Sequence, residues 1–234
     1  MNENDWLESM EPKAMFTHVY RQLDQRKQRL LACACIRSIW HNLHDERFRT
    51  LVELSEALAD GRATIEQVDQ AGRNVHQIDS QIEFPRVLFE PPLSAMVAAM
   101  SVCDHNVTVG FSQALKFSLL SYAPCCKDQV TGWPNEPEPT RLNVQARHLA
   151  NLTRDIVGNP FQLVYLHPDW LAWNNGTVGQ LAETIYEERR YQDLPVLADA
   201  LEEAGCDDTE ILDHLRGPGV HARGCWVLDL ARGV

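Results

Sequence analysis

The stretch DLPVLADALEEAG, from Asp193 to Gly205, decides the fold class. Its opening aspartate is a favoured N-cap residue, and Pro195 suits the first helical turn, where an N–H has no partner within the helix. Leu197 and Leu201 are four residues apart, so they share one helix face. Gly205 is typical of the residue just past a helix end. This stretch therefore predicts one complete amphipathic helix.

The same helical period extends over most of the 234 residues. Apolar residues at steps of three, four or seven, which all keep one helix face, include Met15, Val19 and Leu23; Cys33, Ile36, Trp40 and Leu43; Val68, Val75 and Ile78; and Leu142, Leu149, Leu152 and Ile156. Residues 93–103 and 109–122 are apolar nearly all round and suit the buried centre. Only Phe161–Leu166 could form a short strand. We expect an all-α globular protein of about eight to ten helices.

The best candidate for a domain boundary is the proline-rich stretch 124–139. Proline and glycine interrupt helices, so this stretch suits a linker or loop between an N-terminal helical region, 1–123, and a C-terminal one, 140–234. The alternative is one compact domain that carries a long loop.

Composition excludes several classes of protein. Apolar residues make up 44% and charged residues 23%, as in ordinary globular proteins, and the net charge is −12. An acidic chain is poorly suited to binding nucleic acid or an anionic membrane directly. There is no secretory leader and no apolar run of about 18 residues. Seven cysteines cannot all pair within one chain, which favours reduced thiols and a cytoplasmic location.

The negative charge is concentrated between residues 183 and 213, which hold eleven acidic and two basic residues. A solvated outer face is the simplest interpretation. The alternatives are a docking surface for a basic protein partner and a mimic of nucleic-acid charge.

Three blocks of sequence resemble a bacterial family with many paralogous copies per genome and no established activity. The blocks are RLLACAC at 29–35 with the following Trp40-His41, RDIVGNPF at 154–161, and LPVLADALEEAGC at 194–206 with HARGCWVLD at 221–229. The resemblance implies no catalytic residue or cofactor. Other members carry a cysteine where this chain has Leu215, and that departure counts against a metal ligand at this position.

The C-terminal candidate metal ligands are Cys206, His214, His221 and Cys225. His221 and Cys225 are four residues apart, so they face the same way in either a helix or a strand. A bend at Gly217-Pro218-Gly219 would fold them back towards His214. Cys206 is harder to include, because eight helical residues would place it about 12 Å from His214. Three such ligands could hold zinc with an open position, as in a hydrolase. The alternative is a capping histidine with core cysteines.

Other residue sets are better explained by packing. Cys33 and His44 would lie about 16 Å apart along a helix, too far to share an ion, and Cys35 points away from Cys33. We therefore interpret these cysteines as core residues. Cys103 with His105 is a poor nucleophile–base spacing. Asp155 is interpreted as fixing a helix exit.

The sequence contains no phosphate-binding glycine loop, GxSxG, HExxH or paired CxxC motif. We therefore expect a non-enzymatic module that binds another protein. One alternative is a zinc-binding protein, such as a zinc hydrolase, and zinc is then the only candidate cofactor. The other alternative is an acidic mimic of nucleic acid.

Overall fold

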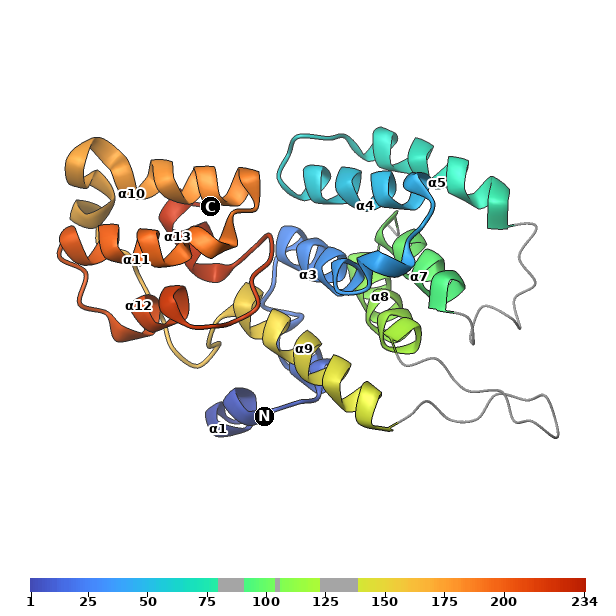
Figure 1. Ribbon diagram of the computed structural model, residues 1–234, viewed down its shortest axis with the longest axis horizontal. Coiled ribbons are helices and arrows are strands. Elements are labelled where there is room, and N and C mark those ends of the chain that lie inside the picture. Colours follow the sequence, from blue (N-terminus) through green and yellow to red (C-terminus); the bar gives the residue numbers. More distant parts are fainter. Residues whose placement is uncertain (80–90, 104–105, 123–138) are drawn as a thin grey trace. The chain divides into compact units, whose positions relative to one another are not determined.

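The computed structural model describes residues 1–79, 91–103, 106–122 and 139–234, and all structural statements concern these residues (Figure 1). They form twelve α-helices and no β-strand, which confirms the all-α prediction. The helices outnumber the eight to ten expected, in part because α1 (Glu3–Glu8) is too short to display an apolar stripe. No helix in these ranges has both the length and the apolar character needed to cross a bilayer.

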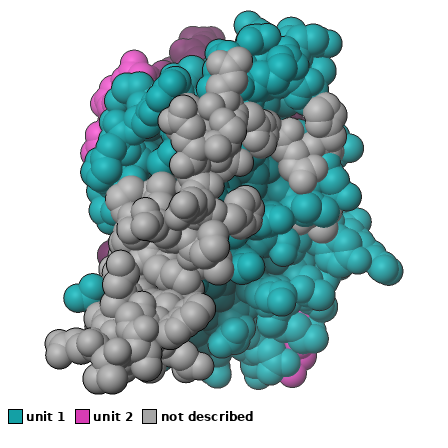
Figure 2. All heavy atoms as spheres, turned by 90° about the vertical axis from the view of Figure 1, so that its right-hand side faces the viewer, with its two compact units in different colours: residues 1, 3–153 teal, residues 2, 154–234 magenta. Residues whose placement is uncertain are grey.

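The chain divides into two compact units, coloured separately in Figure 2. Unit 1 comprises Met1 and residues 3–153, and unit 2 comprises Asn2 and residues 154–234. The division falls inside α9 (Pro139–Val157), whose last turn belongs to unit 2. The linker predicted at 124–139 lies outside the described residues except for Pro139, so that boundary stays a prediction.

Unit 1 is built around α3 (Gln25–Arg37), which packs against α4, α7 and α8. The other elements of this unit are α1, α2 (Pro12–Val19), η1 (Trp40–Asn42), α4 (Glu46–Ala59), α5 (Ile65–Asp79), α7 (Pro91–Met100), η2 (Ser101–Cys103), α8 (Val107–Tyr122) and most of α9. Every residue from Gln28 to Ile36 is buried. By contrast, α8 exposes Gln113 and Lys116. The expectation that 109–122 is surrounded on all sides is therefore wrong, and α3 takes that place.

The stripe that runs from Cys33 to Leu43 is not a single helix. The helix α3 ends at Arg37, and the chain continues through the 3-10 helix η1. Ser38, at the break, donates its hydroxyl to the Cys35 carbonyl at 2.6 Å. Ile39 and Leu43 are still fully buried. Trp40, which the spacing places on the same face, is only half-buried. The apolar spacing therefore identified the other three buried positions of the stripe but neither Trp40 nor the helix end.

Unit 2 contains the last turn of α9 followed by α10 (Pro168–Glu188), η3 (Tyr191–Asp193), α11 (Leu194–Glu203), α12 (Thr209–Arg216) and α13 (Trp226–Arg232). Within it, α11 packs against α10 and α12, and α10 packs against α13, as Figure 1 shows. Leu197 and Leu201 are fully buried in its core, and Gly205 takes the left-handed conformation. The helix predicted between Asp193 and Gly205 is confirmed.

Three irregular segments shape unit 2. Residues 173–176 interrupt α10 with non-helical dihedrals, and Asn174, Asn175 and Gly176 have positive φ, as the Asn-Gly sequence predicts. Phe161–Leu166 has no regular secondary structure, so the one candidate strand is not formed. Residues 217–225 form neither helix nor strand, and the tail becomes helical only at Trp226.

Candidate metal centre

Four side chains from three parts of unit 2 converge on one point. Asp155 comes from the last turn of α9 and His214 from the last turn of α12, while His221 and Cys225 come from the connection between α12 and α13. Each offers one potential ligand atom, and these atoms all lie within 4.8 Å of one another. No other group of three or more such side chains occurs among the described residues.

The two contacts of His214 Nε2 within the cluster have nearly the spacing of a tetrahedral metal shell. His214 Nε2 lies 3.2 Å from Cys225 Sγ and 3.2 Å from Asp155 Oδ1. Zinc bonds of about 2.0 to 2.3 Å require donor separations of about 3.3 to 3.8 Å at tetrahedral angles. His221 Nδ1 is closer, 2.7 Å from Asp155 Oδ1, which is a hydrogen-bond distance. Metal binding would replace the proton of this bond and separate the two atoms by about 0.6 Å.

Backbone conformation at two glycines brings these segments together. Gly158 ends α9 with a φ of 75°, and a Cβ there would lie 3.2 Å from the Trp226 ring. A Cβ at Gly217 would lie 2.9 Å from the Asp213 carbonyl oxygen, closer than real Cβ atoms approach. A side chain at this position would therefore force the exit from α12 to shift. The predicted return of the tail towards His214 is confirmed, because the imidazole centroids of His214 and His221 are 5.2 Å apart.

The Asp155 carboxylate is the centre of the hydrogen-bond network. Its side chain is 2% exposed, and its Oδ2 accepts the Ala222 backbone N–H at 2.9 Å. This bond ties the connection before α13 to the last turn of α9. Burial raises the pKa of Asp155, but hydrogen bonds and charge from His214 and His221 outweigh it, so the pKa lies below its ordinary value. Asp155 is thus held as a carboxylate, the form that binds metals.

Cys225 is fully buried at the start of α13. Burial, followed by the charge of Asp155, raises the pKa of this thiol well above 9.0, against the effect of the backbone N–H groups of Leu228 and Val227. A thiol in this state is a poor nucleophile, because catalytic cysteines need exposure and a lowered pKa. The contact with His214 therefore does not make a thiol-enzyme pair.

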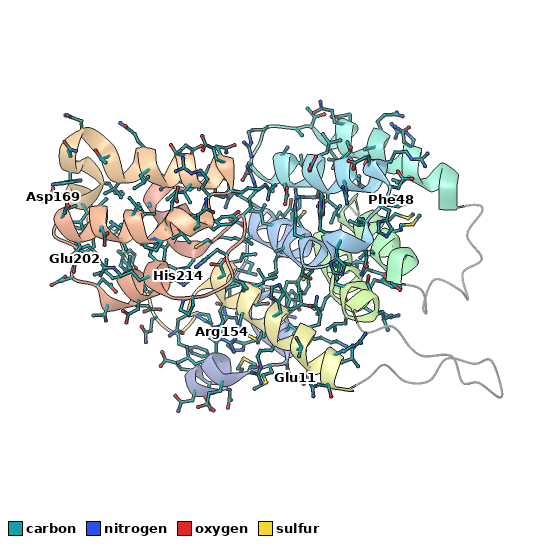
Figure 3. The ribbon with its side chains drawn as sticks, viewed as in Figure 1. Glu11, Phe48, Arg154, Asp169, Glu202 and His214 are labelled. Atoms are coloured by element: carbon teal, nitrogen blue, oxygen red, sulfur yellow. The ribbon has the colours of Figure 1, made fainter. Side chains whose placement is uncertain are left out.

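The outer contact of His214 is made by Trp226, the first residue of α13. The indole Nε1–H donates to His214 Nδ1 at 3.3 Å, and the two ring centroids are 5.2 Å apart. Figure 3 labels His214 together with Arg154, the residue before Asp155. Histidine ligands in metal sites usually donate their second ring N–H to an acceptor. The tryptophan reverses this pattern, since an indole nitrogen can only donate.

The structure brings together three of the four C-terminal residues that the sequence singled out. His214, His221 and Cys225 belong to the cluster, whereas Cys206 does not. Cys206 is buried in the unit 2 core, where burial raises the pKa of its thiol. The sequence analysis missed Asp155, which it interpreted as a helix-exit residue. The available signal was its position between Leu152 and Ile156, both buried, which places a carboxylate on the inner face of α9.

The N-terminal cysteines have the packing role expected of them. Cys33 and Cys35 are both 1% exposed in α3, and they form no metal-like group with other described residues. Burial raises the pKa of the Cys33 thiol to about 12. Cys103, considered above with His105, and the adjacent Cys125 and Cys126 have side chains outside the described residues.

Comparison with protein-family models, with curated proteins and with solved structures gives no match for this chain. The resemblance to a paralogous bacterial family therefore stays a prediction, and the functional argument depends on the geometry of unit 2.

Proposed function

We propose that the protein binds one zinc ion through Asp155, His214, His221 and Cys225, and that the ion has a structural role in unit 2. The observation that carries this proposal is the convergence of four potential ligand atoms from three segments within 4.8 Å. The buried carboxylate at its centre provides a fixed negative charge to which a cation can bind.

The chemistry of the donors favours zinc over magnesium or calcium. Two imidazoles, a thiolate and one carboxylate oxygen form a mixed soft and intermediate set, whereas the alkaline-earth ions take oxygen ligands almost exclusively. Zinc is commonly held by four such donors in a tetrahedral shell. The short donor separations at His214 Nε2 fit that shell.

The completeness of the ligand set supports a structural ion over a hydrolytic one. Catalytic zinc keeps a coordination position for water, whereas structural zinc is closed by four protein ligands. Here Asp155 supplies the fourth donor that the three sequence-predicted residues lacked. The side chains of Asp155 and His221 are 2% and 8% exposed, which leaves little access for a substrate.

Such an ion would join the last turn of α9, the end of α12 and the start of α13. The connection between α12 and α13 contains three glycines and has no regular structure before Trp226. Ordering that connection costs conformational entropy, so a ligand that binds only the folded form shifts the folding equilibrium by mass action. At a free zinc concentration of 1,000 times Kd the gain is about 4 kcal/mol.

The expected protein-interaction role has no comparable geometric support. Four of the eleven acidic residues in the stretch 183–213 pair with arginines that follow it in the sequence. Arg216 binds both Asp199 and Glu202 at 2.7 Å, and Arg232 binds Glu183 at 2.5 Å. These pairs reduce the negative electrostatic potential of the stretch. Both a basic partner and a nucleic-acid-binding protein would recognise that potential. A protein partner of unidentified kind stays a prediction.

Metal analysis of the purified chain tests the proposal. We expect one equivalent of zinc per chain, removable by a chelator and restored on addition of zinc. Replacing a residue that only orients a metal ligand commonly costs about 10- to 100-fold in metal affinity. Loss of a ligand itself, in Cys225→Ser or His221→Asn, is therefore expected to cost more than about 100-fold. Cys206→Ser is the matched control, because it replaces a buried cysteine of the same unit that lies outside the cluster.

The outcomes of this experiment separate cleanly. Zinc loss confined to the two cluster variants supports the site. Equal zinc content in the Cys225→Ser, His221→Asn and Cys206→Ser proteins, or no stoichiometric metal in the unmodified protein, refutes it. Cobalt substitution gives a second readout, because a cobalt–thiolate absorption band must be present in the unmodified protein and absent from Cys225→Ser.

A further inference from the structure

Trp226 occupies a position that affects which nitrogen of His214 can bind a metal. Its indole N–H donates to His214 Nδ1 at 3.3 Å. An indole nitrogen has no lone pair to accept with, so His214 Nδ1 must be the acceptor and carry no proton. In the neutral imidazole the proton is therefore on Nε2.

The same Nε2 is the atom that faces the cluster. It lies 3.2 Å from Asp155 Oδ1 and 3.2 Å from Cys225 Sγ. A protonated Nε2 can donate to the carboxylate, but it has no lone pair for a metal. A metal at Nε2 requires the other tautomer, in which the Nδ1–H points at the indole N–H. Two N–H groups would then face each other where a hydrogen bond now exists.

We infer that Trp226 sets the zinc affinity of this site by holding His214 in the tautomer that cannot ligate. The inference rests on the proposed zinc site and adds a positioning residue that regulates it. Zinc uptake shifts the His214 proton from Nε2 to Nδ1 and breaks the bond from the indole. The His214 proton stays on its own ring. The protons of the Cys225 thiol and of His221 Nδ1 pass to solvent when these two atoms bind zinc.

The packing of Trp226 makes the indole hard to turn aside. The ring lies against Gly158, where a Cβ would be 3.2 and 3.3 Å from two of its atoms. Trp226 also packs against the core of unit 2, next to buried Val227 and Leu228. The packing of the ring thus fixes the direction of the indole N–H. Zinc binding has to break the hydrogen bond to His214 without moving the indole aside.

Replacing the indole by a phenyl ring separates these effects. Trp226→Phe largely keeps the aromatic packing but removes the N–H. The His214 tautomer that can bind zinc is then no longer disfavoured by the lost indole hydrogen bond. One neutral hydrogen bond is worth a factor of about two to ten in an equilibrium. We expect Trp226→Phe to bind zinc about two- to tenfold more tightly than the unmodified protein in a chelator-competition titration. Trp170→Phe, a matched change at the edge of the same core, is expected to leave the zinc affinity unchanged.

The direction of the change distinguishes this role from a packing role, because loss of packing alone would weaken zinc binding. Tighter binding by Trp226→Phe supports the inference, and equal or weaker binding overturns it. If the unmodified protein binds no zinc, the zinc site itself is refuted. If it binds zinc and Trp226→Phe does so equally well, only the role of Trp226 is refuted.

A measurement on the metal-free protein does not depend on how the variant folds. Long-range ¹H–¹⁵N spectra of histidine-labelled protein report which ring nitrogen carries the proton. We expect His214 to be protonated on Nε2 and unprotonated on Nδ1. A spectrum with the proton of His214 on Nδ1 overturns the inference whatever the zinc affinities are.

Discussion

Replacing Asp155 by asparagine tests whether the cluster stabilises unit 2 before any metal is bound. In Asp155→Asn the amide oxygen can still accept the Ala222 N–H, as Oδ2 does at 2.9 Å. The amide NH₂ then takes the place of Oδ1, which now faces His221 Nδ1 at 2.7 Å and His214 Nε2 at 3.2 Å. Two hydrogen bonds to a charged group become contacts between donors.

The magnitude follows from these two bonds. Hydrogen bonds to charged groups contribute about 1.5 kcal/mol or more each, so we expect the free energy of unfolding to fall by about 3 kcal/mol. Breaking a buried charge pair from one side gives a similar figure, about 3 to 5 kcal/mol. Because the Asp155 carboxylate is only 2% exposed, water cannot replace the two lost bonds, and the full loss of stability is expected.

Urea unfolding in the presence of a chelator measures this loss. The midpoint is expected to move to lower urea while the slope with denaturant stays constant, since the change affects stability and not the surface exposed. Asp199→Asn is the matched control, because it removes a charge that pairs with Arg216 at an exposed position. Its midpoint is expected to stay within experimental error. A midpoint for Asp155→Asn that moves no further than that of Asp199→Asn would refute the reasoning.

Three further predictions concern pH, thiol reactivity and backbone conformation. Because the pKa of Asp155 is lower in the folded protein, its contribution to stability is fully present above its unfolded pKa of about 3.9 and is lost as the pH falls through the folded value. Chelator-treated protein should therefore lose stability more steeply in acid than Asp155→Asn does, and parallel curves would contradict this. With its pKa raised from 9.0 to about 12, the Cys33 thiol should hold about 1,000-fold less thiolate at pH 8 than an ordinary cysteine. Mass-spectrometric mapping of iodoacetamide labelling should find Cys33 modified only after unfolding, and prompt labelling of the native protein would disprove its burial. Gly158→Ala combines a positive φ with a 3.2 Å contact to Trp226, so thermal unfolding should show a loss of about 1 to 3 kcal/mol. Gly61→Ala, which has a positive φ in open space, is its control and should lose less.

Local signals in the sequence predicted much of the helical fold. The helix with Pro195 near its start and Gly205 after its end depends only on neighbouring residues, and α11 has these features. The positive φ values at Asn174 and Asn175 follow equally from the local Asn-Gly sequence. Features of this kind are decided within one or two turns of chain.

Features that depend on distant contacts were not predictable in the same way. The complete burial of α3 requires α4, α7 and α8 around it, which a stripe on one face does not indicate. Likewise, Asp155 lies 59 residues before His214 in the sequence, and nothing in its own neighbourhood identifies its partners. The four-residue spacing of His221 and Cys225 suggested this pair, but the segment between them is neither helix nor strand, so distant contacts bring the two side chains together. Spacing could not supply the carboxylate that completes the set.

Anomalous diffraction at the zinc absorption edge tests the central claim most directly, using crystals of protein prepared without chelator. The account predicts one anomalous peak about 2.0 to 2.3 Å from His214 Nε2, His221 Nδ1, Cys225 Sγ and one oxygen of Asp155. An anomalous map with no peak among these four side chains, recorded from protein supplied with zinc, would contradict it.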